Sequence, residues 1–185
     1  MRFWEEKLLP YQKFDRIKLL PKHYFVVSGT ALSSVSALNA FDGALKTAGI
    51  HNLNLVKVSS ILPKGAIHLE LTEEEVAAFF EAGEVVFTVQ ASVIRKGEKY
   101  LSAGLIWGEG SGTNGFVIEH ASSRPPRAMP TTEVLRKQVV DSLASMFQEG
   151  VRIRNIRTKE PEFKITEIHV PKDMYGCALV SLILC

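Results

Sequence analysis

The run Val58-Ser59-Ser60-Ile61-Leu62-Pro63 joins a predicted strand, residues 53–58, to a Pro63-Lys64-Gly65 break. Adjacent serines are by themselves an ordinary loop or strand-end feature, and Ser33-Ser34 and Ser122-Ser123 occur in the same chain. The segments on either side therefore decide how this run is interpreted.

The segment Leu38-Asn39-Ala40-Phe41-Asp42-Gly43-Ala44-Leu45 predicts a helix over residues 37–48, with Gly49 as its stop. Its apolar residues recur at helical spacing: Leu38, Phe41, Leu45 and Ala48. At 100° per residue Asp42 lies about 40° from Leu38, so its carboxylate is expected at or beside the apolar face. A carboxylate placed there is costly unless a cation or hydrogen-bond donors pair with it.

Two further helices are predicted from their caps. Thr72-Glu73-Glu74-Glu75 has the form of a capping box, which predicts a helix from there to Gly83. Thr131 or Thr132 is expected to cap a long amphipathic helix that stops at Gly150.

Strands fill the spaces between these helices. Residues 85–94 and 100–107 flank Lys96-Gly97-Glu98 and predict a hairpin. The other predicted strands are residues 24–28, 116–120, 151–158, 163–170 and 177–184. Helices and mainly antiparallel strands alternate without a regular βαβ rhythm, which predicts an α+β fold with helices over a sheet.

Length and composition fit one compact domain over residues 1–185, since 185 residues of which 46% are hydrophobic can bury a sizeable core. Residues 1–22 mix charges with single large apolar residues without clean periodicity. We expect them to form an arm that docks elsewhere or frays.

The charge balance argues against nucleic acid and membrane surfaces as partners, because both usually require a clear basic excess and the net charge is +2. One basic cluster stands near the end of the chain: Arg152, Arg154, Arg157 and Lys159. Arg152 and Arg154 alternate with apolar residues, which predicts a solvated strand face.

No charged-then-apolar leader and no apolar run near eighteen residues is present, so a cytoplasmic protein is expected. The two cysteines, Cys177 and Cys185, form no metal-like spacing. The five histidines are scattered singly, and the sequence predicts no metal site.

The segment Gly110-Ser111-Gly112-Thr113-Asn114-Gly115 matches the G-x-G-x-x-G dinucleotide pattern and follows a predicted strand. That fingerprint requires a helix next, whereas Phe116-Val117-Ile118 is apolar, β-branched and brief, as in a strand. The pattern is therefore interpreted as the tip of a long hairpin.

Together, the serine run and the helix before it resemble the self-cleavage region of pyruvoyl-dependent arginine decarboxylases. The resemblance is ungapped over residues 24–67 and looser in three later segments. These are Ala103-Gly104-Leu105-Ile106-Trp107, Phe116-Val117-Ile118-Glu119-His120 and Asp173-Met174-Tyr175-Gly176-Cys177-Ala178. It implies a four-layer αββα sandwich, whereas the sequence pattern alone reaches only a mixed α+β fold.

The resemblance implies a zymogen in which the Ser60 hydroxyl attacks the Ser59 carbonyl. Serine suits this step because its oxygen is a nucleophile and, once acylated, a leaving group. Cleavage would give a β chain, residues 1–59, and an α chain, residues 60–185, that begins with a pyruvoyl group made from Ser60. That self-made group would be the cofactor, with neither pyridoxal phosphate nor a metal. Its ketone would form a Schiff base with arginine and act as the electron sink for loss of CO2, giving agmatine.

The resemblance also assigns site residues. Glu119 matches the glutamate that protonates the product, in a setting expected to be apolar, and Glu109 is the rival because the 108–115 loop makes the match ambiguous. Asp42 matches the residue that meets the substrate's guanidinium group, and Leu38 lies at the same pocket. Ordinary pairing of Asp42 with Lys46 is the alternative.

Asn54 matches an active-site asparagine, and a structural asparagine at a turn is the alternative. Six residues separate it from Ser60, which is roughly 20 Å along a straight strand, so one chain can hardly bring both to one substrate. Neighbouring subunits would then share the site, which agrees with the family's homotrimers; a dimer of trimers is a further option. His51 stands where the family often has a small residue, which leaves the pocket's size open.

Two other functions compete with this carboxy-lyase activity. The chain could decarboxylate another amino acid, such as histidine or lysine, or it could be an unprocessed assembly subunit without catalysis. The physiological role, polyamine biosynthesis or acid resistance, is left open by the sequence.

Overall fold

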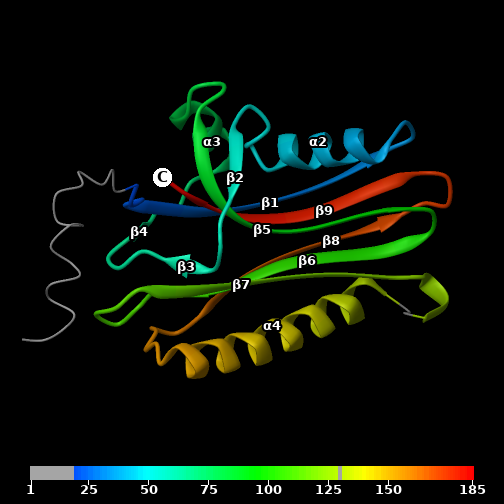
Figure 1. The fold of residues 1–185 in the computed structure, drawn as a ribbon. Coiled ribbons are helices and arrows are strands. Elements are labelled where there is room, and N and C mark those ends of the chain that lie inside the picture. The colour runs from blue at the N-terminus through cyan, green and yellow to red at the C-terminus, as the bar shows by residue number, and fades with distance from the viewer. Residues whose placement is uncertain (1–18, 129–130) are drawn as a thin grey trace, which may run out of the picture.

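A computed structural model of the chain describes residues 19–128 and 131–185. Figure 1 shows four layers: helices α2 and α3, two stacked sheets, and helix α4 on the far side. The expected αββα sandwich is confirmed. Most of the predicted N-terminal arm, residues 1–18, lies outside the described residues.

The first sheet, sheet A, has five strands in the order β2-β5-β9-β1-β4. In chain order they are β1 (His23–Ser33), β2 (Asn54–Lys57), β4 (Ile67–His68), β5 (Val85–Lys96) and β9 (Tyr175–Leu184). β9 pairs antiparallel with both β1 and β5. It is buried on both faces, which explains its continuous apolar run.

The second sheet, sheet B, has four strands in the order β3-β7-β6-β8. They are β3 (Ile61–Leu62), β6 (Lys99–Gly108), β7 (Gly115–Arg124) and β8 (Glu162–Val170), and all their pairings are antiparallel. β6 and β7 form a hairpin whose tip includes Gly112 at φ 74°. The prediction of a hairpin tip in place of a nucleotide loop is confirmed.

The turn at Lys96-Gly97-Glu98 is not a hairpin, because β5 belongs to sheet A and β6 to sheet B. Gly97 has φ 80° and donates its N–H to the Met174 carbonyl at 3.0 Å, in the connection that carries β8 back to β9. The two turns together form one corner of the sandwich. A glycine turn between two apolar strands is equally compatible with a hairpin and with a change of sheet.

Helix α2 (Ala37–Thr47) begins at Ser36, whose side chain accepts the Asn39 N–H, and it ends before Gly49 at φ 75°. It packs on sheet A through small residues, Ala40, Ala44 and Ala48. Leu38 is 67% exposed, so its prediction as part of the buried stripe was wrong. Phe41 and Leu45 are partly buried against the same core, and the helix runs close to β1 at Ala44, because a Cβ at Gly29 would overlap the Ala44 carbonyl.

Helix α3 (Glu73–Phe79) has the predicted capping box at Thr72 and Glu75, although it ends before Gly83. Helix α4 (Thr132–Arg154) is capped by Thr131, as predicted, and covers sheet B. The apolar face of α4 consists of Leu135, Val139, Leu143 and Phe147.

The predicted stop of α4 at Gly150 was wrong, and so was the strand over residues 151–158. The helix continues to Arg154 and ends at Asn155, which has φ 51°. Gly150 is a packing residue, because a Cβ there would overlap the Phe116 ring. The arginines therefore lie on the last turn of a helix, where cations interact favourably with the helix dipole. Arg152 pairs with Glu149, and Arg154 lies over the Phe116 ring.

Candidate active site

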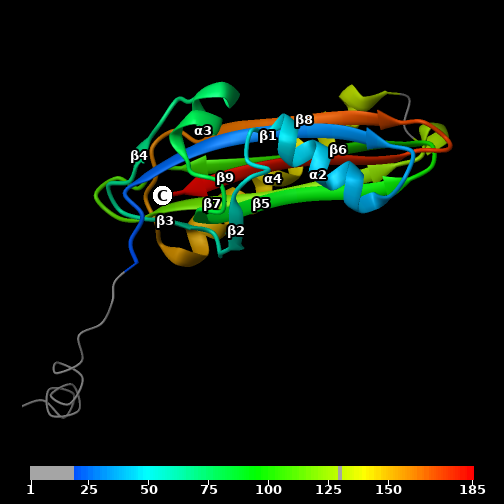
Figure 2. The same ribbon diagram turned by 90° about the horizontal axis from the view of Figure 1, so that it is seen from above.

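The serine pair crosses from one sheet to the other. β2 is the edge strand of sheet A and β3 is the edge strand of sheet B, and residues 58–60 connect them. Figure 2 shows β2 and β3 at the same edge of the sandwich. The Val58 N–H donates to the Thr88 carbonyl on β5, and the Val117 N–H on β7 donates to the Ser60 carbonyl, both at 2.9 Å. One hydrogen bond to each sheet thus holds the two ends of the link.

Within this link the Ser59 carbonyl, which is the predicted cleavage point, accepts a hydrogen bond from the Ile61 N–H at 2.8 Å. Ser59 is exposed and Ser60 is half-buried. The link is therefore partly open to solvent, and hydrogen bonds to both sheets fix its ends.

Glu119 lies on β7, two residues beyond Val117, a separation of about 7 Å along a strand. Strand alternation turns it toward the same side as Val117 and Ala121, which pack in the core between the sheets. β3 does not extend this far, so β7 is the edge strand here and Glu119 is exposed. The apolar surroundings expected for it are absent from a single copy of the chain.

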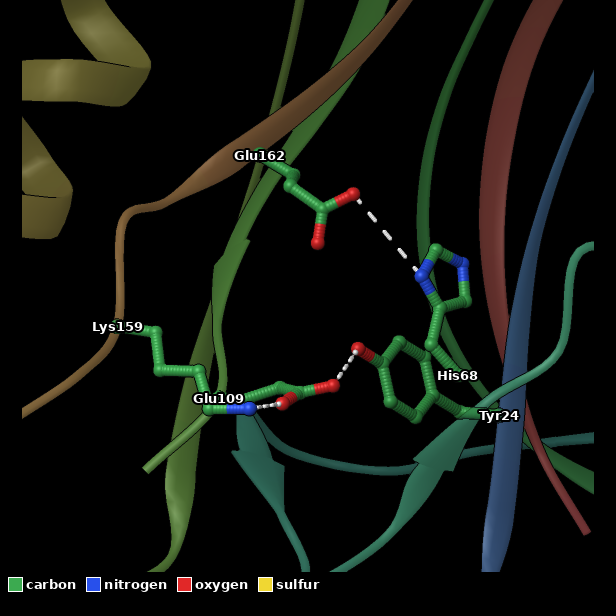
Figure 3. Close-up of polar contacts among 5 residues, drawn as sticks. All are labelled: Tyr24, His68, Glu109, Lys159 and Glu162. Atoms are coloured by element: carbon green, nitrogen blue, oxygen red, sulfur yellow. Dashed lines mark hydrogen bonds and ion pairs between the residues drawn. The ribbon is translucent and has the colours of Figure 1, made fainter. Parts of the chain in front are cut away.

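Glu109, the rival to Glu119, lies just after β6 and is held by side chains from two other segments. Tyr24 Oη donates to its Oε1 at 2.9 Å and Lys159 Nζ donates to its Oε2 at 2.6 Å (Figure 3). The Lys159 hydrogen bond is the main reason that the pKa of Glu109 lies below its usual value. Glu109 is therefore held as a carboxylate, which makes it a poor proton donor.

The polar cluster around Glu109 joins the two sheets. Tyr24 stacks on His68 with ring centroids 4.7 Å apart, and the His68 ring meets the edge of Trp107 at 5.9 Å. His68 Nδ1 lies 3.9 Å from a Glu162 carboxylate oxygen (Figure 3). Burial raises the pKa of Tyr24, and the Glu109 carboxylate raises it further, so the phenol remains a donor. Sequence reasoning missed this cluster because its members are single residues far apart in the chain.

Asp42 and Leu38 are one helical turn apart on α2, and both are exposed. Within the described residues, no ion pair of 4 Å or less joins Asp42 to Lys46, so the alternative pairing is not formed. α2 covers the outer face of sheet A, whereas the Ser60 carbonyl is bonded to sheet B (Figure 1). One copy of the chain does not bring these residues to the serine pair.

Asn54 begins β2, and its side-chain Nδ2 donates to the Gly83 carbonyl at 2.7 Å. This contact ties the start of β2 to the loop before β5, which is the structural role considered as the alternative. Of the predicted site residues, the fold thus brings together Ser59, Ser60 and Glu119. It leaves Asp42, Leu38 and Asn54 elsewhere in the same copy.

Residues 23–185 match the family model described as pyruvoyl-dependent arginine decarboxylase (PvlArgDC). The chain belongs to this family. The match spans every described strand from β1 to β9 and helices α2, α3 and α4, so the resemblance seen in the serine run extends through the sandwich.

Relatives named pyruvoyl-dependent arginine decarboxylase occur in several archaea. The protein from Methanopyrus kandleri is 32% identical over 165 residues, which is 89% of this chain and 97% of the relative. The one from Pyrococcus horikoshii is 30% identical over 168 residues, 90% of this chain and 96% of the relative. The Archaeoglobus fulgidus protein named pyruvoyl-dependent arginine decarboxylase 2 is 37% identical over 106 residues, 56% of this chain and 66% of the relative.

No three His, Cys, Asp or Glu side chains among residues 19–128 and 131–185 are grouped to hold a metal ion. No helix in this part of the chain is long and apolar enough to cross a membrane.

Proposed function

We propose that this chain cleaves itself between Ser59 and Ser60 and then decarboxylates L-arginine to agmatine and CO2. The observation that carries the proposal is the serine pair, hydrogen-bonded to both sheets beside Glu119 in a chain whose family cofactor is a pyruvoyl group. Like its relatives, it would be a carboxy-lyase.

The cleavage uses the chain's own atoms. The Ser60 Oγ attacks the Ser59 carbonyl carbon, the C–N bond breaks, and the serine proton passes to the released nitrogen, which leaves an ester. Loss of the Ser60 Cα proton then expels the Ser59 carboxylate, and hydrolysis of the resulting dehydroalanine releases ammonia. The products are residues 1–59 and residues 60–185 with a pyruvoyl group at position 60.

A pyruvoyl group at position 60 supplies a ketone that withdraws electrons from the substrate as CO2 leaves. The half-buried position of Ser60 at the end of the inter-sheet link fits such a group, since its neighbours on both sides are fixed by hydrogen bonds. Glu119, which lies on β7 two residues beyond Val117, is the proposed proton donor to the product. A single copy of the chain leaves this carboxyl exposed, so a neighbouring surface would have to cover it.

Asp42 is proposed to bind the guanidinium group of arginine, because a carboxylate can accept two parallel N–H bonds from that planar fork. Leu38, one turn away, would contact the substrate's methylene groups. Asn54 would contribute the amide oxygen that its contact with Gly83 does not use. These residues are exposed in one copy and distant from the serine link, so we propose that neighbouring copies share each site.

A homotrimer of cleaved chain pairs is the proposed assembly, and trimers could pair further. Sharing a site would cover Glu119 with a neighbouring surface and give it the apolar setting that one copy lacks. We place the enzyme in the cytoplasm, where Cys177 and Cys185, both free thiols, would stay reduced.

The test combines an intact mass spectrum under denaturing conditions with release of CO2 from carboxyl-labelled arginine. Wild type should give fragments 1–59 and 60–185, the second lighter by one ammonia than a serine-started peptide, and should release CO2. Ser60→Ala, the control, should stay full length and inactive. Cleavage with CO2 release only from histidine or lysine would reassign the substrate, and an uncleaved wild type would make the chain an assembly subunit.

A further inference from the structure

The three-residue turn at the cleavage point has a hydrogen bond of its own. The Ile61 N–H donates to the Ser59 carbonyl at 2.8 Å, a bond from residue i+2 back to residue i that defines a γ-turn centred on Ser60. In the described residues Asn155 alone among non-glycines has positive φ, so Ser60 has negative φ and the turn is the inverse, unstrained form.

The strand register explains why this N–H is free to bind Ser59. Ile61 lies opposite Phe116, and the hydrogen bond next to that pair runs from the Val117 N–H to the Ser60 carbonyl. This is the pattern of a non-hydrogen-bonded antiparallel pair, in which both backbone N–H groups point away from the partner strand. The sheet therefore makes no use of the Ile61 N–H.

We infer that the Ile61 N–H is the oxyanion donor for self-cleavage, an inference that rests on the proposed function. When the Ser60 Oγ bonds to the Ser59 carbonyl carbon, the carbonyl π electrons move to the Ser59 oxygen, which becomes negative. In the uncleaved chain this donor lies 2.8 Å from the oxygen on which the charge would develop. Donors of oxyanion holes lie about 2.7–3.1 Å from the position that the oxyanion takes up. The charge is lost again when the C–N bond breaks and the ester forms.

The surrounding contacts keep this donor in place during the reaction. The Val58 N–H is bonded to sheet A and the Ser60 carbonyl to sheet B, so the residue before the turn and the central residue of the turn are both held as the carbon becomes tetrahedral. A donor that is already oriented needs no reorganisation when charge develops, which is why such groups accelerate reactions more than water does.

Replacing the Ile61 peptide N–H with an ester oxygen removes the donor and keeps the side chain. This backbone ester should slow the appearance of fragments 1–59 and 60–185 by about 10²-fold, the effect of losing one oxyanion donor. The matched control is a backbone ester at Ala66, whose N–H donates to the Pro63 carbonyl at 3.1 Å in the same segment. It should cleave within about twofold of wild type, since that bond lies away from the reacting carbonyl.

An Ile61 ester that cleaves as fast as wild type, while remaining folded by its thermal midpoint, overturns the inference. A wild type that never cleaves refutes the proposed function instead, so the two failures are distinct. A second measurement covers a poorly folded ester: infrared spectra of Ser60→Ala with 13C at the Ser59 carbonyl. Removing the Ile61 N–H should raise that carbonyl's stretching frequency, and an unchanged frequency contradicts the inference.

Discussion

Replacing Gly150 with alanine should destabilise the fold, although alanine is the better helix former. At an exposed helical position the change stabilises by about 0.8–1 kcal/mol. Here the new Cβ would overlap Cε1 of the Phe116 ring and lie 2.7 Å from its Cζ. Phe116 is 2% exposed and also packs against Phe147, so the ring has little room to move. Overpacking of this kind costs about 1–3 kcal/mol, which exceeds the gain in helix propensity.

The expected net loss is about 1 kcal/mol in the free energy of unfolding, or about 2–4 °C in thermal midpoint for a chain of this size. Thermal unfolding should be measured in the Ser60→Ala background, so that every variant is a single uncleaved chain. Gln148 is an exposed position on the same helix, and comparing Gln148→Gly with Gln148→Ala gives the propensity difference alone. A Gly150→Ala chain that gains as much stability as that pair would refute the packing argument.

Three further outcomes are expected. Glu109→Gln should lower stability by about 1 kcal/mol at pH 7. The folded pKa of Glu109 is depressed, so its contribution to stability is present above the usual carboxyl pKa and is lost as pH falls through the folded pKa. In denaturant titrations the free energies of unfolding of wild type and Glu109→Gln should therefore become equal in acid, and a difference that stays constant with pH would contradict this. Gly29→Ala should lower the free energy of unfolding by more than about 2 kcal/mol, because its Cβ would overlap the Ala44 carbonyl and α2 would have to move away from sheet A. An unchanged thermal midpoint would contradict this expectation. Glu119→Gln should cleave normally yet release CO2 about 10²- to 10⁴-fold more slowly, and equal loss of cleavage would instead point to misfolding.

Features set by local chemistry were predictable from the sequence. The Thr72 capping box and the Thr131 cap were found because a cap depends on residues within one turn of each other. Gly150 and Leu38 were misassigned because their places depend on partners distant in the chain, the Phe116 ring and the outer face of sheet A. Periodicity gives the faces of a helix, and it does not give how closely the helix approaches its neighbour.

The candidate site shows the same limit. The serine run was identified from its order along the chain, but its proximity to Glu119 comes from the register of β3 on β7, which no local pattern encodes. The turn at Gly97 was predicted correctly as a turn and wrongly as a hairpin, because sheet membership is decided by pairing with β9, about eighty residues later. The Glu109 cluster likewise exists only once the two sheets are stacked.

The position of β1 in sheet A determines what the proposed cleavage would do to the fold. β1 precedes Ser59 in the chain and lies inside sheet A, between β9 and β4. It forms ten residue pairs with β9, which follows Ser60. A cut at the serine link would leave two interlocked pieces that come apart only by unfolding. Neither piece has a complete sheet A alone. The proposed cleavage would therefore leave sheet A shared between two polypeptides, each of which needs the other to keep its strands paired.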